Sequence, residues 1–173
     1  MKETLRDLKE RRSIRAYRPE QIKEEELAQV LEAGMWAPSG MGQQPVVFVA
    51  VQDPGTREQL RKMNASIMGD PDSDPFYGAP TIVVVLADTD RPTYVEDGSL
   101  AMGNLMNAAQ AVGLGSCWIH RAKEEFASKE GKELLRKWGL GDNYAGVGHC
   151  ILGYADGEKP EAEARAEGRM IRV

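Results

Sequence analysis

Apolar residues recur along the chain in two patterns, one typical of helices and one typical of strands. Five segments predict helices: residues 2–12, 22–36, 54–67, 97–112 and 122–138. In residues 2–12 and 22–36 the apolar positions recur at helical spacing and form one face. Four shorter apolar runs predict strands, because they are too short for buried helices and are bounded by glycine, proline or aspartate. These runs are residues 45–51, 81–88, 113–119 and 146–155.

Three local features sharpen this outline. Asp53 followed by Pro54 is typical of a helix N-terminus, with a capping side chain and a proline in the first turn. Residues 68–80 are rich in Gly, Pro and Asp and predict a loop. Helix 97–112 is apolar around most of its circumference, so we expect it at the centre of a core or in a subunit interface. Strands separated by long helices without strict alternation favour an α+β or three-layer domain.

The size and composition of the chain exclude several classes of protein. Its 173 residues and 19.1 kDa fit one domain, and no linker or repeat divides residues 1–173. The 22 basic and 27 acidic residues give a net charge of −5, which argues against nucleic-acid binding through a broad basic surface. Two cysteines and two histidines exclude a disulfide framework and a Cys-rich zinc module, so we predict no metal site.

The sequence carries no apolar segment suited to a membrane. The charged N-terminus has no signal-like apolar region, and the run 82–87 is far shorter than the roughly 20 residues of a membrane-spanning helix. We therefore expect a cytoplasmic protein without membrane or nucleic-acid partners.

Basic residues are concentrated near the N-terminus, where residues 1–23 carry eight of them against four acidic ones. This distribution indicates a local anion site. The segment RRSIRAY, residues 11–17, holds three arginines and a serine within five positions. Guanidinium groups present paired donors that match phosphate oxygens, and serine adds a neutral donor, so the segment suits a phosphate. A solvated basic stretch explains the same residues equally well.

A second segment, APSGMGQQP at residues 37–45, suits a flat ligand. Its small residues let the backbone approach closely, and its glutamines offer amide groups. Taken alone, the segment is also explained as a plain helix-to-strand connection.

Motifs of other enzyme classes are absent from the sequence. There is no P-loop, no Gly-x-Gly-x-x-Gly fingerprint and no Gly-x-Ser-x-Gly elbow. Cys117 and Cys150 lack partner motifs and are interpreted as small buried hydrophobic residues. His149 lies in an apolar strand and is interpreted as a hydrogen-bonded core histidine.

Four segments together resemble the nitroreductase family of FMN-dependent oxidoreductases, and the resemblance covers the whole chain. RRSIRAY and APSGMGQQP are similar to the first two signatures of the family, and residues 103–119 and 148–160 to its central helix and last core strand. The resemblance implies a three-layer α+β fold with a mostly antiparallel central sheet, in an interlocked homodimer. It also implies FMN at the subunit interface, NADH or NADPH as hydride donor, and ping-pong transfer to a small nitroaromatic or quinone acceptor.

The same resemblance implies which residues bind FMN. They are Arg11, Arg12 and Ser13 for the phosphate and ribityl chain; Arg15 for the pyrimidine edge; Pro38, Ser39, Gly40, Met41 and Gln43 from the partner subunit; Trp118, Ile119 and His120 beside the ring; and Arg165 for the phosphate. We expect the tail 156–173 to pack on the FMN site or on the partner. No residue is expected to act as a nucleophile, because FMN carries the hydride. The accompanying proton comes from solvent or from His120, and Tyr77 either lines the acceptor pocket or packs as a loop tip.

The chain departs from the family pattern at three positions. Gly42 stands where Asn is common, Val46 where an aromatic residue is common, and Glu163 where a basic residue often precedes the C-terminal arginine. The contacts at Gly42 and Val46 are therefore open, and phosphate binding depends more on Arg11 and Arg12. Other functions also stay open: flavin destruction, reductive dehalogenation or ring dehydrogenation on the same fold, a non-catalytic flavin-binding module, or an interaction protein that dimerises through helix 97–112.

Overall fold

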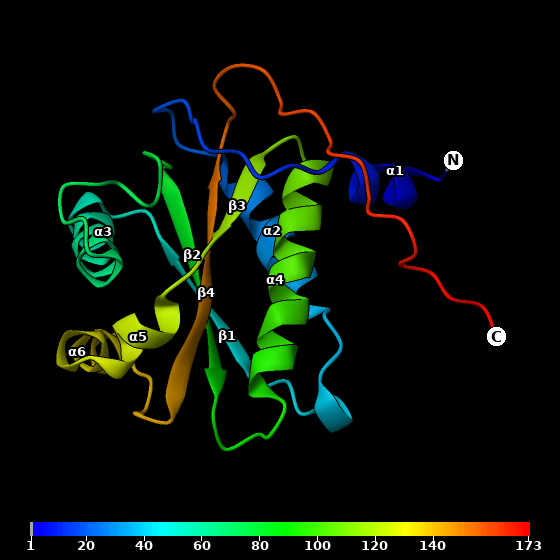
Figure 1. Ribbon diagram of the computed structural model, residues 1–173. Helices are drawn as coiled ribbons and strands as arrows, with labels where there is room; N and C mark the ends of the chain where they lie inside the picture. Colours follow the sequence, from blue (N-terminus) through cyan, green and yellow to red (C-terminus); the bar gives the residue numbers. More distant parts are fainter. Residues whose placement is uncertain (1) are drawn as a thin grey trace.

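Four antiparallel strands form the central layer of the protein (Figure 1). The computed structural model describes residues 2–173. In chain order the strands are β1 (Val46–Val51), β2 (Thr81–Asp88), β3 (Gly115–Ile119) and β4 (Tyr144–Gly153). Their order across the sheet is β1-β2-β4-β3, so β2 and β4 are central and β3 is an edge strand.

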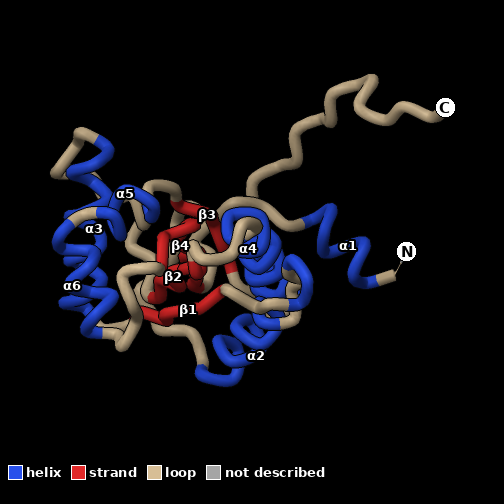
Figure 2. Tube along the Cα trace, turned by 90° about the horizontal axis from the view of Figure 1, so that it is seen from below, coloured by secondary structure: helices blue, strands red, loops and turns tan. Residues whose placement is uncertain are grey.

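Helices cover both faces of this sheet (Figure 2). In chain order the helices of the protein are α1 (Glu3–Glu10), α2 (Glu24–Met35), the 3-10 turn η1 (Gly40–Gly42), α3 (Pro54–Met68), α4 (Tyr94–Ala111), α5 (Ala122–Ala127) and α6 (Lys129–Lys137). α2 and α4 pack on one face, and α3, α5 and α6 lie on the other. The predicted three-layer α+β fold with an antiparallel sheet is confirmed. None of the helices in residues 2–173 has the length and apolarity of a membrane-spanning segment.

The two faces of the sheet are buried in separate apolar clusters. Neighbouring residues of β2 point to opposite faces, so Val84 belongs to one cluster and Val85 to the other. Phe126 of α5 fills the first cluster and Leu105 of α4 fills the second, and both side chains are fully buried. α4 therefore lies in the core, as predicted for the helix 97–112, yet Leu100 on its outer side is 50% exposed.

One predicted helix is divided in two. The single helix predicted from the sequence over residues 122–138 is wrong, because α5 ends before Ser128 and α6 begins after it. The hydroxyl of Ser128 accepts the N–H of Gly131 at 3.0 Å and caps α6. A Cβ at Gly131 would overlap the carbonyl oxygen of Glu125, so glycine lets the two helices pack closely. The other predicted elements agree with the structure to within three residues at each end.

Gly98→Ala is expected to destabilise the protein by about 1–3 kcal/mol through overpacking. A Cβ at Gly98 would lie 2.5 Å from Cγ2 of Val147, which is the extra residue of a bulge in β4. Urea denaturation measures the change, with Ser99→Ala on the same turn of α4 as the control, expected within about 0.5 kcal/mol of wild type. Equal stability of the two variants would contradict close packing of α4 on β4.

Both ends of the chain extend away from the layered body (Figure 2). α1 has no buried residue, and Leu5 and Leu8 on its apolar side are 52% and 51% exposed. Residues 156–173 form no helix or strand, and each of them is exposed. The start of the tail still contacts the body, where Asp156 donates its N–H to the carbonyl of Ala16 at 2.9 Å, whereas the later part leads away from it (Figure 2). The packing of the tail against the FMN site or a partner stays a prediction.

Candidate functional site

The N-terminal segment 11–17 lies along the edge strand β3. The N–H of Ile14 donates to the carbonyl of Ser116 at 3.0 Å, in parallel with the strand. The hydroxyl of Tyr17 donates to the carbonyl of Ile14 at 2.7 Å, and burial raises the pKa of this phenol, which therefore stays a donor. These contacts hold the segment against the sheet and place its arginines in two separate hollows.

The first hollow lies between this segment and the C-terminal end of α4, and it is positively charged. Arg11, Arg12 and Lys159 line it. Nη1 of Arg12 donates to the carbonyls of Lys9 and Arg11, each at 2.7 Å, which holds this guanidinium in place. Nη1 of Arg11 and Nε of Arg12 are buried, and neither donates to any group within residues 2–173.

The positive charges that line this hollow suit an anion. Buried donors without partners are rare and costly, and a phosphate would satisfy these arginine nitrogens with charge-assisted hydrogen bonds. Lys159 was not predicted from the sequence; its Nζ donates to Oε1 of Gln110 at 2.9 Å, a contact made by the folded chain. Arg165, which was predicted for the phosphate, is exposed in the tail and does not line the hollow.

The second hollow lies beyond the other end of β3. The predicted residues that line it are Arg15, Trp118, Ile119 and His120. Arg121, Met68 and Tyr77 line it as well, and of these only Tyr77 was considered from the sequence. A Cβ at Gly148 would overlap Nε1 of Trp118, so glycine in β4 makes room for the indole.

The two cysteines offer no nucleophile to this hollow, although Cys117 is among its lining residues. Both side chains are buried, as predicted. Burial raises the pKa of the Cys150 thiol, which therefore stays protonated at neutral pH.

Strained backbone conformations occur at the second hollow and in the segment 37–45. In residues 2–173, the non-glycine residues with positive φ are Met41, Gln44, Tyr77 and Arg121. Such a conformation costs roughly 1–3 kcal/mol per residue and tends to cluster at functional sites. Tyr77 and Arg121 line the second hollow, and Met41 and Gln44 belong to the predicted partner-contacting segment.

That segment is a loop fixed to the N-terminal end of α4. The carboxylate of Asp97, which is 3% exposed, accepts the N–H of Gly40 at 2.8 Å and the hydroxyl of Thr93 at 2.9 Å. A Cβ at Gly40 would overlap Oγ1 of Thr93, so only glycine fits without displacement. Asp97 therefore holds the loop in place, a role that its sequence position inside an apolar helix did not reveal.

Asp97→Asn is expected to destabilise the protein by about 1–3 kcal/mol, because an amide turned toward two donors leaves one of them unsatisfied. The amide of Gly40 should then exchange its hydrogen faster, which mass spectrometry measures in the peptide containing it. Glu96→Gln, on the exposed side of α4, is the matched control and should leave this exchange unchanged. Equal exchange in the two variants would contradict the role of Asp97.

Two of the groups of predicted site residues lie at opposite ends of α4. Asp97 marks the end with the loop, and Gln110 marks the end with the first hollow. At about 1.5 Å per residue, these two positions are roughly 20 Å apart. Pro38, Ser39, Gly40, Met41 and Gln43 therefore lie far from Arg11 and Arg12 of their own chain. Met41 at the tip of the loop is 84% exposed, and Trp36 before it is 79% exposed.

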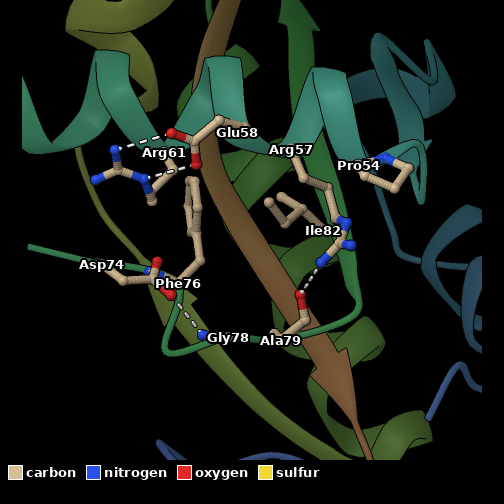
Figure 3. A pocket seen from close by; sticks show the side chains of 9 residues that line it. All are labelled: Pro54, Arg57, Glu58, Arg61, Asp74, Phe76, Gly78, Ala79 and Ile82. Atoms are coloured by element: carbon tan, nitrogen blue, oxygen red, sulfur yellow. Dashed lines mark hydrogen bonds and ion pairs between the residues drawn. The ribbon is translucent and has the colours of Figure 1, made fainter. Parts of the chain in front are cut away.

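A further hollow lies between α3 and the loop before β2, and it contains none of the predicted residues (Figure 3). Its charges are mostly paired: Arg61 donates to Glu58 at 2.8 and 3.0 Å, and Nη1 of Arg57 donates to the carbonyl of Ala79 at 3.1 Å. The carboxylate of Asp74 accepts the N–H of Gly78 at 2.6 Å. Nε of Arg57 is buried without a partner within residues 2–173, but the carboxylates of Glu58 and Asp74 line the same hollow and make it less suited to an anion than the first hollow.

Known proteins resemble this chain in sequence and in fold. A model of the nitroreductase family matches residues 8–154. A protein of Archaeoglobus fulgidus, named "Putative NADH dehydrogenase/NAD(P)H nitroreductase", is 35% identical over 169 residues, which cover 95% of this chain and 92% of the relative. A nitroreductase of Bacteroides fragilis, solved with bound FMN, superposes over the full length of both chains with a TM-score of 0.91 and 29% identity. One from Desulfitobacterium hafniense, also with FMN, covers 100% of this chain and 99% of its own, with a TM-score of 0.88 and 27% identity.

Proposed function

The chain belongs to the nitroreductase family, and from this membership we propose that it is an FMN-dependent NAD(P)H oxidoreductase. The observation that carries the proposal is the pair of buried, unpartnered guanidinium nitrogens on Arg11 and Arg12, which suit the phosphate of FMN. Homologues named for NAD(P)H and structures that contain FMN support the same cofactor and hydride donor.

The phosphate and the ring would occupy the two hollows along β3. Arg11, Arg12 and Lys159 would bind the phosphate, with Ser13 beside the ribityl chain and Arg165 closing from the tail. The ring would lie at the second hollow, where Arg15 places positive charge beside its pyrimidine edge and Trp118, Ile119 and His120 border it. Bound FMN would supply the chemistry, taking a hydride from NADH or NADPH and passing two electrons to the acceptor.

The protein's own residues would orient the reactants and shield them from water. Arg15 stabilises negative charge that develops on the pyrimidine side of the ring. No side chain is needed as a nucleophile, and the proton that accompanies the hydride comes from solvent, with His120 as the alternative donor because it is exposed at the hollow.

A second copy of the chain would complete the site. The loop with Pro38, Ser39, Gly40, Met41 and Gln43 lies at the opposite end of α4 from Arg11 of its own chain, and a partner could present this loop to the ring. Exposed apolar residues near this loop, Trp36 and Met41 among them, suit burial in a homodimer. The exposed leucines of α1 and the tail 156–173 would pack on the partner in the same assembly.

Steady-state kinetics test the proposed reaction and its acceptor class. With FMN added, the protein should oxidise NADH or NADPH in the presence of a nitroaromatic or quinone. Reciprocal plots at several acceptor concentrations should be parallel, as a ping-pong cycle requires. Flavin-dependent oxidation with halogenated acceptors only, or with none of these, would favour one of the other reactions of the fold.

A further inference from the structure

A buried polar cluster lies beneath the second hollow. Asn64 of α3, Glu125 of α5 and His149 of β4 are each fully buried. Nδ2 of Asn64 donates to Oε1 of Glu125 and, at 2.8 Å, to the carbonyl of His120. Oε2 of Glu125 lies 3.1 Å from Nε2 of His149. Neither this oxygen nor either ring nitrogen of His149 has a hydrogen-bond partner within residues 2–173, so the hydrogen bond predicted for His149 is not formed although its burial is confirmed.

The cluster reaches the hollow through Arg121. Nε of Arg121 donates to Oδ1 of Asn64 at 2.9 Å, and Nη2 lies 3.1 Å from the sulfur of Met68. Asn64 thus uses its two amide atoms to connect the buried carboxylate of Glu125 with a guanidinium that lines the hollow. Glu125 does not line the hollow, whereas Arg121 does. The charged group of this cluster at the hollow is therefore the guanidinium of Arg121.

The backbone of Arg121 supports a role beyond packing. Its φ is +77°, the left-handed region that glycine adopts at little cost and that other residues adopt rarely. Arginine at this position therefore carries strain that glycine would avoid. In an exposed loop, an arginine at a strained position has no advantage over glycine. At a site that needs a positive charge in a fixed position, the charge offsets the strain.

We propose that Arg121 is a second cofactor-binding cation, positioned by Asn64 and Glu125 at the second hollow, where it favours the electron-rich, reduced form of the flavin. This inference depends on the proposed function, which places the ring at that hollow. Arg15 and Arg121 would then place two positive charges beside the ring. Asp74 also lines the hollow, but its carboxylate is held by the N–H groups of Phe76 and Gly78 at 2.9 and 2.6 Å.

The midpoint potential of bound FMN tests this proposal, because a charge beside the ring changes it while a purely structural residue does not. Arg121→Gly removes the charge and relieves the backbone strain, so the variant should fold. It should favour oxidised flavin at least tenfold more than wild type, a fall of about 30 mV for two electrons. Arg121→Lys should retain most of the wild-type potential. Arg136→Gln, which removes an exposed charge from α6, is the control and should leave the potential unchanged.

The variant Asn64→Leu tests whether Asn64 positions Arg121. With its amide removed, Arg121 loses its anchor, so the potential should fall toward that of Arg121→Gly. The double variant should fall no further, because both changes remove the same interaction. A wild-type potential in Asn64→Leu would overturn the positioning role. If this variant does not fold, the comparison of Arg121→Gly with Arg121→Lys still decides the role of the charge.

The outcomes separate this inference from the proposed function. An Arg121→Gly protein that binds FMN with the wild-type potential would overturn the role of Arg121 alone. A wild-type protein that takes up no FMN would overturn the proposed function and this inference with it.

Discussion

Replacing Arg11 and Arg12 together by glutamine is expected to weaken FMN binding by about 10²–10⁴-fold. Each charge-assisted hydrogen bond contributes about 1.5–3 kcal/mol, and each 1.4 kcal/mol corresponds to about a tenfold change in affinity. The nitrogens in question, Nη1 of Arg11 and Nε of Arg12, are already buried and free of protein partners, so a phosphate gains them without breaking other bonds. Titration of the apoprotein with FMN, followed by quenching of the flavin fluorescence, measures the loss.

The single variant Arg11→Gln makes a second, opposite prediction. Without ligand, Nη1 of Arg11 is a buried donor that has no partner within residues 2–173, so its replacement should leave the stability of the apoprotein unchanged or raise it. Arg18→Gln is the matched control, because Arg18 is exposed beside Glu20 at 3.9 Å and lines neither hollow. A double variant that binds FMN as tightly as Arg18→Gln would place the phosphate elsewhere.

Met41→Asp is expected to reduce FMN content and activity more than tenfold although Met41 is 84% exposed in a single chain. Aspartate tolerates the positive φ of this position, so the fold should be unaffected. In the proposed dimer, however, the new carboxylate would face the partner's flavin, where it is desolvated and repels negative charge on the ring. FMN content per chain, measured from the visible spectrum after gel filtration, gives the result.

Mixed dimers make this prediction specific. A chain with Arg11→Gln and Arg12→Gln, combined with a Met41→Asp chain, should form dimers with one intact site and one doubly defective site. Such dimers would recover about half of the wild-type FMN content, because each site takes its arginines from one chain and its loop from the other. If both parts of a site came from one chain, the mixed dimer would contain no intact site and would recover nothing.

Local sequence patterns predicted the fold well wherever one side chain determines one feature. Asp53 caps α3 through the N–H of Thr56 at 2.7 Å, as its position before a proline predicts. The unbroken apolar run of β2 is buried on both faces, as its composition predicts. The division of 122–138 was missed because Ser128 and Gly131 interrupt the helix by capping and close packing, and neither effect changes the apolar periodicity.

The residues of the candidate site were predictable only where they belong to one contiguous sequence motif. The motif RRSIRAY identified Arg11 and Arg12 of the first hollow and Arg15 of the second. The match to the nitroreductase family confirms the resemblance on which the site was predicted. Lys159, Asp97 and Arg121 were missed, because their roles arise from contacts between segments distant in sequence. One feature of the sequence could have indicated Arg121, because this residue directly follows the predicted residues Trp118, Ile119 and His120.

An anaerobic titration tests the central claim most directly. The purified protein, supplied with FMN and freed of excess, should show flavin absorbance at roughly 450 nm, with about one FMN per chain. One equivalent of NADH or NADPH should bleach this band, and a quinone or nitroaromatic acceptor should restore it. A protein that takes up no FMN, or that holds FMN which neither nucleotide reduces, would contradict its assignment as an FMN-dependent oxidoreductase.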